Sequence, residues 1–135
     1  MTDVLNDMKA ILVAAGDAGT IELARLPDQP DAVLALRTYP AEVGRDPNGR
    51  MLPALERIAV QMVVRVAANA GEKAAMQRAW TAYYALANKH VTGASGQVYD
   101  WFIPNAVPAP LGYDPLDRPM VVVNWSIQAW GELAP

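Results

Sequence analysis

The chain has 135 residues, of which 53% are hydrophobic and 19% charged, and its formal net charge is −3. This length and apolar fraction predict one globular domain with its own core and exclude a disordered chain. The absence of cysteine excludes disulfides, thiol catalysis and thiolate metal sites, and the single histidine, His90, excludes a metal site with two imidazole ligands. The small negative charge provides no general attraction for nucleic acid or for an anionic membrane.

No segment has the pattern of a membrane span or of a secretory signal. The longest uninterrupted apolar run covers six residues, 10–15, whereas a membrane helix needs about 20. The first residues are acidic where a secretory signal is basic. We therefore expect that the chain is made in the cytoplasm and that it does not associate with a membrane.

The first part of the chain predicts one helix followed by two short strands. Apolar residues at helical spacing predict a helix over about residues 3–15, with Gly16 as its stop. Strands are expected at residues 20–24 and 32–39. Between them, residues 26–31 contain two prolines and two aspartates, which suit a turn.

The clearest strand signal covers residues 56–67, where apolar residues alternate with others. The buried face is expected to hold Ile58, Val60, Met62, Val64 and Val66. The other face is expected to be solvated and holds Arg57, Gln61 and Arg65. The preceding residues 40–55 contain three prolines and the turn signal Asp46-Pro47-Asn48-Gly49, which predict a long surface loop.

The second part of the chain predicts an amphipathic helix and two more strands. The helix runs from about residue 69 to residue 90 and is expected to pack on the sheet through one stripe, which consists of Met76, Ala79, Trp80, Tyr83, Leu86 and Ala87. A turn at 92–96, a strand at 97–103, a proline-rich irregular segment at 104–119 and a last strand at 120–130 follow. In the last strand polar and apolar residues alternate.

The resulting element order is α-β-β-β-α-β-β. This order predicts a single α+β domain in which a mixed or antiparallel sheet is packed by two helices.

Motifs that carry chemistry are absent from the sequence. Neither standard phosphate-binding glycine motif occurs. The stretch Gly93–Gln97 is one glycine short of a nucleophile elbow, and it follows a helix instead of a strand. His90 is expected at a helix end, where a cation is favoured by the helix dipole, and no nucleophile or orienting acid is recognisable for it.

Four aspartates lie within two residues of a proline and are interpreted as turn formers, not as an acid pair or a calcium site. They are Asp28, Asp31, Asp114 and Asp117. Arg57 and Arg65 lack interleaved aromatic residues, so a solvated sheet face is favoured over a nucleic-acid surface. We therefore expect no catalytic residue, no cofactor and no metal site.

Charge is unevenly distributed along the chain. Residues 1–31 hold six acidic and two basic residues, whereas residues 37–65 hold five arginines and three acids. Complementary patches of this kind suggest head-to-tail association of copies. Among the tryptophans, Trp125 is expected in the core, and Trp130 is expected to be exposed as an interface anchor.

Several stretches in a fixed order resemble the minor capsid or tail-terminator proteins of long-tailed bacteriophages. The N-terminal helix ends in Ala14-Ala15-Gly16, and residues 25–31 (RLPDQPD) lead into residues 32–36 (AVLAL). The strand of residues 57–66 precedes an alanine-rich helix. Residues 111–114 (LGYD) and Arg118-Pro119 lead into residues 121–126 (VVVNWS). The similarity covers nearly the whole chain, so we expect residues 1–135 to form one tail-terminator-like domain.

The resemblance implies a non-enzymatic structural protein of the virion. It implies a homo-oligomeric ring, typically a hexamer, that caps the head-proximal end of the tail tube. Its partners would be the tail tube protein and the head–tail connector protein, and DNA would pass through the ring without sequence-specific binding. The interface residues are expected on exposed loops and at the last strand: Arg45, Asn48, Arg50, Tyr113, Asp114, Arg118 and Trp130.

Three other functions stay open at the level of sequence. The first is a head–tail joining protein on the portal side. The second is a small ligand-binding domain or enzyme that uses His90 and an acid. The third is a nucleic-acid-binding domain, which would show strongly salt-dependent affinity for DNA.

Overall fold

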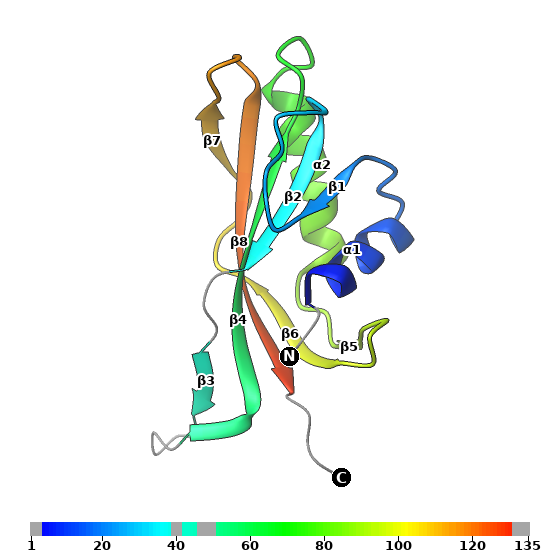
Figure 1. Cartoon of the computed structure of the whole chain (residues 1–135), viewed down its shortest axis with the longest axis vertical. Helices are drawn as coiled ribbons and strands as arrows, with labels where there is room; N and C mark the ends of the chain where they lie inside the picture. The colour runs from blue at the N-terminus through cyan, green and yellow to red at the C-terminus, as the bar shows by residue number, and fades with distance from the viewer. Residues whose placement is uncertain (1–3, 39–41, 46–50, 131–135) are drawn as a thin grey trace.

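A long two-stranded ribbon with helices on one side dominates the computed structural model of the chain (Figure 1). The structure describes residues 4–38, 42–45 and 51–130, and the side chains of residues 4–38 and 57–130. The elements within these ranges are α1 (Val4–Ala14), β1 (Ile21–Leu23), β2 (Val33–Thr38), β3 (Glu42–Arg45), β4 (Met51–Arg65), α2 (Glu72–Leu86), β5 (Val91–Thr92), β6 (Val98–Pro104), β7 (Ala109–Tyr113) and β8 (Pro119–Trp130).

The ribbon is the antiparallel pair of β4 and β8, in register from Leu55 opposite Trp130 to Arg65 opposite Met120. Each strand is longer than its neighbours, so two shorter strands share each outer edge. β2 and β3 pair with different halves of β4, and β7 and β6 pair with different halves of β8. β1 extends the sheet in parallel beyond β2, and β5 extends it beyond β6. The predicted α+β class and mixed sheet are confirmed.

Both helices cover the same face of the sheet (Figure 1). α2 packs on β8 and β4, and α1 packs on α2, β1 and β2. The alternation in β8 places one side chain in two toward these helices, including the fully buried Trp125. The predicted inner face of β4 is likewise buried from Ile58 to Val66. Burying one large apolar side chain stabilises the fold by about 1.5–3 kcal/mol. This face therefore contributes most of the hydrophobic stabilisation of the folded chain.

Two segments that were expected to be irregular contain strands. Within residues 40–55, β3 and the first half of β4 form a hairpin arm, which extends past the end of β2 (Figure 1). The predicted turn Asp46–Gly49 lies outside the described residues. Within residues 104–119, residues 109–113 form β7 despite their proline, because β7 is an edge strand and a bulge between Pro110 and Gly112 accommodates it.

The second helix is shorter than predicted, and the predicted stripe is only partly the buried one: Ala79 and Leu86 are buried, whereas Met76 and Tyr83 are partly buried. The helix ends at Leu86, four residues before His90. Its buried residues are Ala75, Ala79, Ala82 and Leu86. Small side chains allow a close approach of helix and sheet, so the aromatic residues lie at the margin. Trp80 and Tyr83 are partly buried, and Tyr84 is 70% exposed. No helix in the described ranges is long and apolar enough to cross a membrane.

A buried carboxylate fastens α1 to the turn between β5 and β6. Asp7 accepts hydrogen bonds from the backbone N–H of Ser95 at 2.9 Å, from the Ser95 hydroxyl at 2.5 Å and from the Tyr99 hydroxyl. Its side chain passes so close to Gly93 that a Cβ there would lie 2.4 Å from the Asp7 Cγ. The glycine in the stretch that resembled a nucleophile elbow is therefore explained by packing.

Gly93→Ala is expected to lower the free energy of unfolding by about 1–3 kcal/mol, the usual cost of overpacking a tight site. The measurement is urea denaturation followed by tryptophan fluorescence. Ala94→Ser, a change at the exposed neighbouring position, is the matched control and should stay within about 0.5 kcal/mol of the parent. Equal stability of the Gly93→Ala chain would contradict the proposed packing of Asp7.

Candidate functional site

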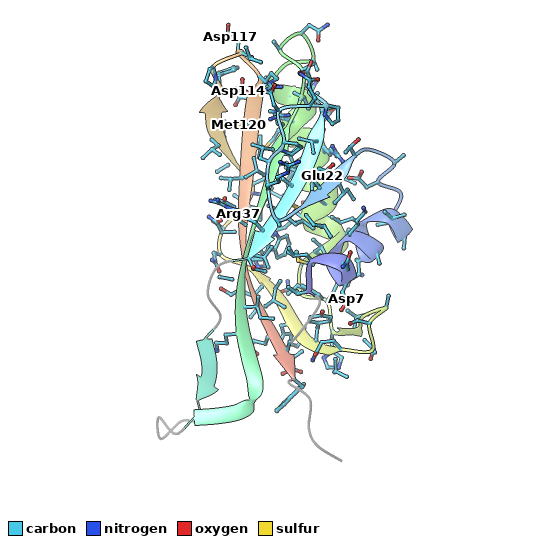
Figure 2. The ribbon with its side chains drawn as sticks, in the orientation of Figure 1. Asp7, Glu22, Arg37, Asp114, Asp117 and Met120 are labelled. Atoms are coloured by element: carbon cyan, nitrogen blue, oxygen red, sulfur yellow. The ribbon has the colours of Figure 1, made fainter. Side chains whose placement is uncertain are left out.

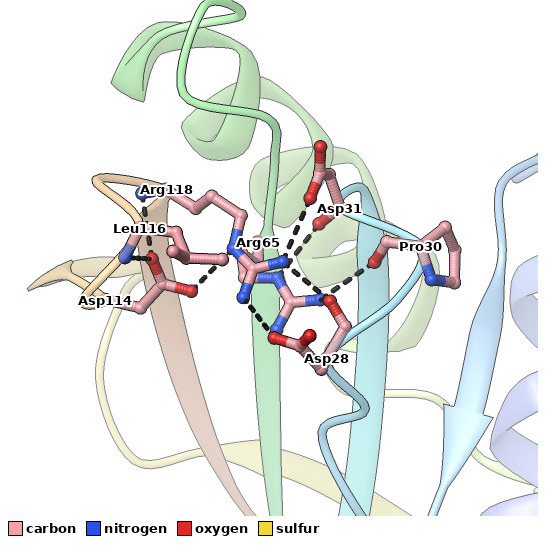
Figure 3. A network of polar contacts seen from close by, with 7 residues as sticks. All are labelled: Asp28, Pro30, Asp31, Arg65, Asp114, Leu116 and Arg118. Carbon is pink, nitrogen blue, oxygen red and sulfur yellow. Dashed lines mark hydrogen bonds and ion pairs between the residues drawn. The ribbon is translucent and has the colours of Figure 1, made fainter.

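Two loops meet at one end of the ribbon, around the side chain of Arg118 (Figure 3). One loop joins β1 to β2, and the other is the turn from β7 into β8. In this turn the Asp114 carboxylate accepts hydrogen bonds from the N–H groups of Leu116 at 2.9 Å and of Arg118 at 3.0 Å. The Asp114 side chain thus shapes the turn, as was predicted for this aspartate.

The Arg118 guanidinium connects this turn to the other loop. Its Nε donates to Asp114 Oδ2 at 2.6 Å, and its Nη1 donates to Asp31 Oδ1 at 2.9 Å and to the Asp28 carbonyl at 2.6 Å. Its Nη2 donates to Asp28 Oδ1 at 3.0 Å. Three carboxylates from two loops therefore surround one guanidinium, and the residue Arg118 is only 4% exposed.

A second arginine, Arg65 at the end of β4, holds the same loop through its backbone. Its Nε donates to the Asp31 carbonyl at 2.9 Å, and its Nη2 donates to the carbonyls of Pro30 at 2.8 Å and Asp28 at 3.2 Å. Arg65 is 2% exposed, so its expected place on a solvated face is wrong. We refer to Asp28, Asp31, Arg65, Asp114 and Arg118 as the Arg118 cluster.

Burial and the neighbouring charges have opposite effects on the pKa values of Arg118 and Asp114. Burial alone would lower the pKa of Arg118, but its hydrogen bonds to Asp114, Asp31 and Asp28 outweigh burial and raise that pKa. Burial and the neighbouring Arg118 charge lower the pKa of Arg65. Burial alone would raise the pKa of the Asp114 carboxyl, but hydrogen bonds from Arg118 and Leu116 outweigh it and lower that pKa. The ionised forms are thus mutually dependent.

Large apolar side chains are exposed on two strands of the sheet. β7 and its flanking residues expose a set of large apolar side chains, which we call the β7 patch: Val107, Leu111, Tyr113 and Leu116. A second set, the β6 patch, lies on β6 and at the far end of β8: Val98, Trp101, Ile103 and Trp130. Exposed apolar groups gathered in this way are typical of protein–protein contacts.

The sequence-predicted interface residues have different environments. Tyr113 is exposed and its hydroxyl donates to Glu72 at 3.3 Å. Asp114 is partly buried in the cluster. The expected exposure of Arg118 is wrong, because its guanidinium is enclosed by three carboxylates. Trp130 is 38% exposed at the end of β8, as expected, and Trp125 is buried, as expected.

The residues expected in the first loop are not placed as a group. Arg45 ends β3, and its side chain lies outside the described part. Asn48 and Arg50 lie outside the described residues. Their predicted role in an interface remains a prediction.

His90 does not lie at a helix end, because α2 ends earlier. Its exposed ring is 3.4 Å from the Asp100 carboxylate and packs near Trp101. Ser95 contacts Asp7 instead, so the histidine and the serine have separate partners. Among the described residues no group of three or more histidines and acids is arranged to hold a metal.

The acidic patch expected in residues 1–31 is largely neutralised inside the chain. Asp28 and Asp31 pair with Arg118, and Asp17 pairs with Arg78 of α2 at 3.0 Å. Asp7 is buried among hydrogen-bond donors, and Asp3 lies outside the described residues. The acids that suggested attraction between copies therefore mainly stabilise the fold.

Sequence reasoning missed the Arg118 cluster because Asp28, Asp31 and Arg65 lie far from Arg118 in the chain. Each aspartate was assigned only to its own turn, and Arg65 only to its own strand. One signal was available, since arginine at the end of an apolar strand requires acceptors if it is buried. Nothing in the sequence identified those acceptors as the carbonyls of the loop at residues 28–31.

Comparisons with known proteins point in one direction. The family profile described as "Bacteriophage tail terminator protein" matches residues 8–129. Seven chains of solved structures match, one of them in the virion of a native gene transfer agent particle. That chain has a TM-score of 0.61 and 17% identity, and the match covers 95% of this chain and 92% of the other. At this identity the likeness shows the fold alone. No curated protein matches the chain.

Arg118→Met is expected to destabilise the chain more than Arg118→Lys does, because methionine removes the guanidinium that pairs with all three carboxylates. Lysine keeps the charge but loses the branched geometry that reaches three carboxylates. Thermal unfolding at pH 7 measures the order, and the exposed Lys89→Met change controls for loss of one charge. A chain in which Arg118→Met matches the parent would refute the structural role of the cluster.

Stability is expected to fall on acidification through the Asp114 carboxyl. Its pKa is lower in the folded chain than the value of about 3.9 in an unfolded chain. The stabilisation is therefore present above about pH 3.9 and is lost as the pH falls through the folded value. Asp114→Asn should be less stable than the parent at pH 7 and should lose less stability between pH 5 and pH 2. Asp117→Asn, in the same turn, should keep the parental profile.

Proposed function

The chain belongs to the bacteriophage tail terminator family, and from that membership we propose that it forms a ring that caps the head-proximal end of the tail tube. In this proposal the protein is a component of the virion, the ring has six copies, and one face of it docks the head connector. DNA passes through the opening without sequence-specific contacts. The family match over residues 8–129 is the observation that carries the proposal.

The distribution of exposed apolar residues supports assembly. The β7 patch adjoins residues 119–122 of β8, whereas the β6 patch adjoins residues 125–130. A chain that joins copies through two different surfaces makes head-to-tail contacts, and these close into a ring when the rotation between copies permits. Two separate patches thus fit a ring better than a two-fold dimer.

Side chains are better suited than open strand edges to make these contacts. Pro110 in β7 has no backbone N–H, and the bulge beside it disturbs the edge. The outer edge of β6 is occupied by the backbone of Asn88 and Lys89 and by β5. We therefore assign the subunit contacts to the exposed apolar side chains and to the hairpin arm of β3 and β4.

A non-enzymatic role is supported by what the charged residues do. Five aspartates bind partners within the chain and thereby fasten one element to another: Asp7, Asp17, Asp28, Asp31 and Asp114. These carboxylates maintain the shape of the fold through hydrogen bonds and ion pairs. The proposed mechanism is accordingly recognition by rigid loops, whose geometry is maintained by the Arg118 cluster.

Phage particles assembled without this chain are expected to contain over-long tails without heads, as seen by negative-stain electron microscopy. Tails of normal length beside DNA-filled heads would instead identify a head–tail joining protein on the portal side. Complete particles would refute the assembly role altogether, and His90 would then be examined as part of a ligand site.

The double change Tyr113→Ala and Leu116→Ala is expected to leave thermal unfolding near that of the parent and to reduce infectious particles at least tenfold. Both side chains are more than half exposed, so the fold does not depend on them. The matched control is Val13→Ala, an equally exposed apolar residue on α1, which should retain full titre. Parental titre for the double variant would remove the β7 patch from the interface.

A further inference from the structure

A groove lies on the sheet face that the helices leave uncovered. Its volume is about 360 Å³. The floor is made by Ala35 of β2, Val63 of β4 and Met120 of β8, and the walls are Leu26 and Leu111. Ala35 and Val63 are buried without belonging to the core under the helices. The two loops that the Arg118 cluster fixes in place thus lead directly into the walls.

The rim of the groove is cationic. Arg25 and Arg37 line it, and none of the described lining residues is acidic. Arg25 is exposed and makes no ion pair with any residue whose side chain the structure describes. An apolar floor beside an unneutralised guanidinium suits a peptide that presents an aliphatic side chain next to a carboxylate.

We infer that this groove binds residues 131–134 of a second copy of the chain, with Leu133 on the floor and Glu132 beside Arg25. The segment reads Gly131-Glu132-Leu133-Ala134, so it combines one aliphatic and one acidic residue between two small ones. The inference rests on the proposed ring and names a contact that joins its neighbouring copies.

The length of β8 excludes binding of this segment to its own groove. Met120, in the floor, and Trp130 are ten positions apart on one strand, which corresponds to about 33 Å. Three residues beyond Trp130 reach at most about 11 Å. Leu133 can therefore occupy only the groove of another copy. Because groove and segment belong to opposite ends of β8, the contact is head-to-tail.

The first test uses a fluorescent peptide with the sequence of residues 130–135 and the full-length chain. Saturable binding is expected, and Arg25→Glu should weaken it at least tenfold. A peptide carrying Glu132→Arg should regain affinity for the Arg25→Glu chain. The matched control is Arg57→Glu, on the same sheet face but outside the groove, which should bind like the parent.

The second test exploits the absence of cysteine from the chain. A Leu26→Cys, Leu133→Cys double variant should give a ladder of disulfide-linked oligomers on a non-reducing gel. Either single variant should stop at dimers. The Leu111→Cys, Leu133→Cys pair should give the same ladder, because Leu111 forms the opposite wall.

The inference and the proposed ring fail in different ways. No peptide binding, or binding unaffected by Arg25→Glu, together with no ladder, would overturn the inference. If such chains still corrected tail length in phage, the terminator function would stand with another subunit contact. Peptide binding and a ladder in a chain that does not affect tail length would support the contact and overturn the proposed function.

Discussion

Two buried guanidinium groups next to each other determine how this end of the molecule is arranged. Arg65 ends β4, and Arg118 directly precedes β8 at the same end of the ribbon. Both residues are buried, and each guanidinium requires hydrogen-bond acceptors once it is removed from water. Arg65 takes backbone carbonyls, and Arg118 takes carboxylates from both loops. The connection between β1 and β2 and the turn into β8 therefore have one position relative to each other. The shape of the surface above them is therefore defined by charge pairing.

Different parts of the β4–β8 ribbon carry the core, the Arg118 cluster and the β6 patch. Its middle carries the core, where α2 lies against buried residues such as Trp125. The end near Met120 and Asp114 (Figure 2) carries the Arg118 cluster and the groove. The other end, near Trp130, carries the β6 patch. A strand pair of this length separates the two surfaces by more than the reach of any side chain. Contacts at one end can consequently be altered without disturbing the other.

Local periodicity allowed most of the fold to be predicted. Alternation in residues 56–67 and 120–130 identified both ribbon strands and their buried faces, and helical spacing identified α1. The edge strands β3 and β7 were missed, although each pairs with the next long strand: β3 pairs with β4, and β7, which contains Pro110, pairs with β8. The stripe of α2 was assigned by hydrophobicity, whereas close packing favoured its alanines. The Arg118 cluster lay beyond prediction because the contacts of Arg65 and Arg118 with the loop at residues 28–31 join residues 34 to 90 positions apart.

The irregular or covered edges of the sheet also limit the pairing of strands between separate chains. An open, regular edge would allow newly made chains to add strand to strand and grow into fibres. Here β7 carries a proline and a bulge, β6 is covered by residues 88–92, and β1 has only three residues. These features disfavour the addition of one newly made chain to another strand by strand.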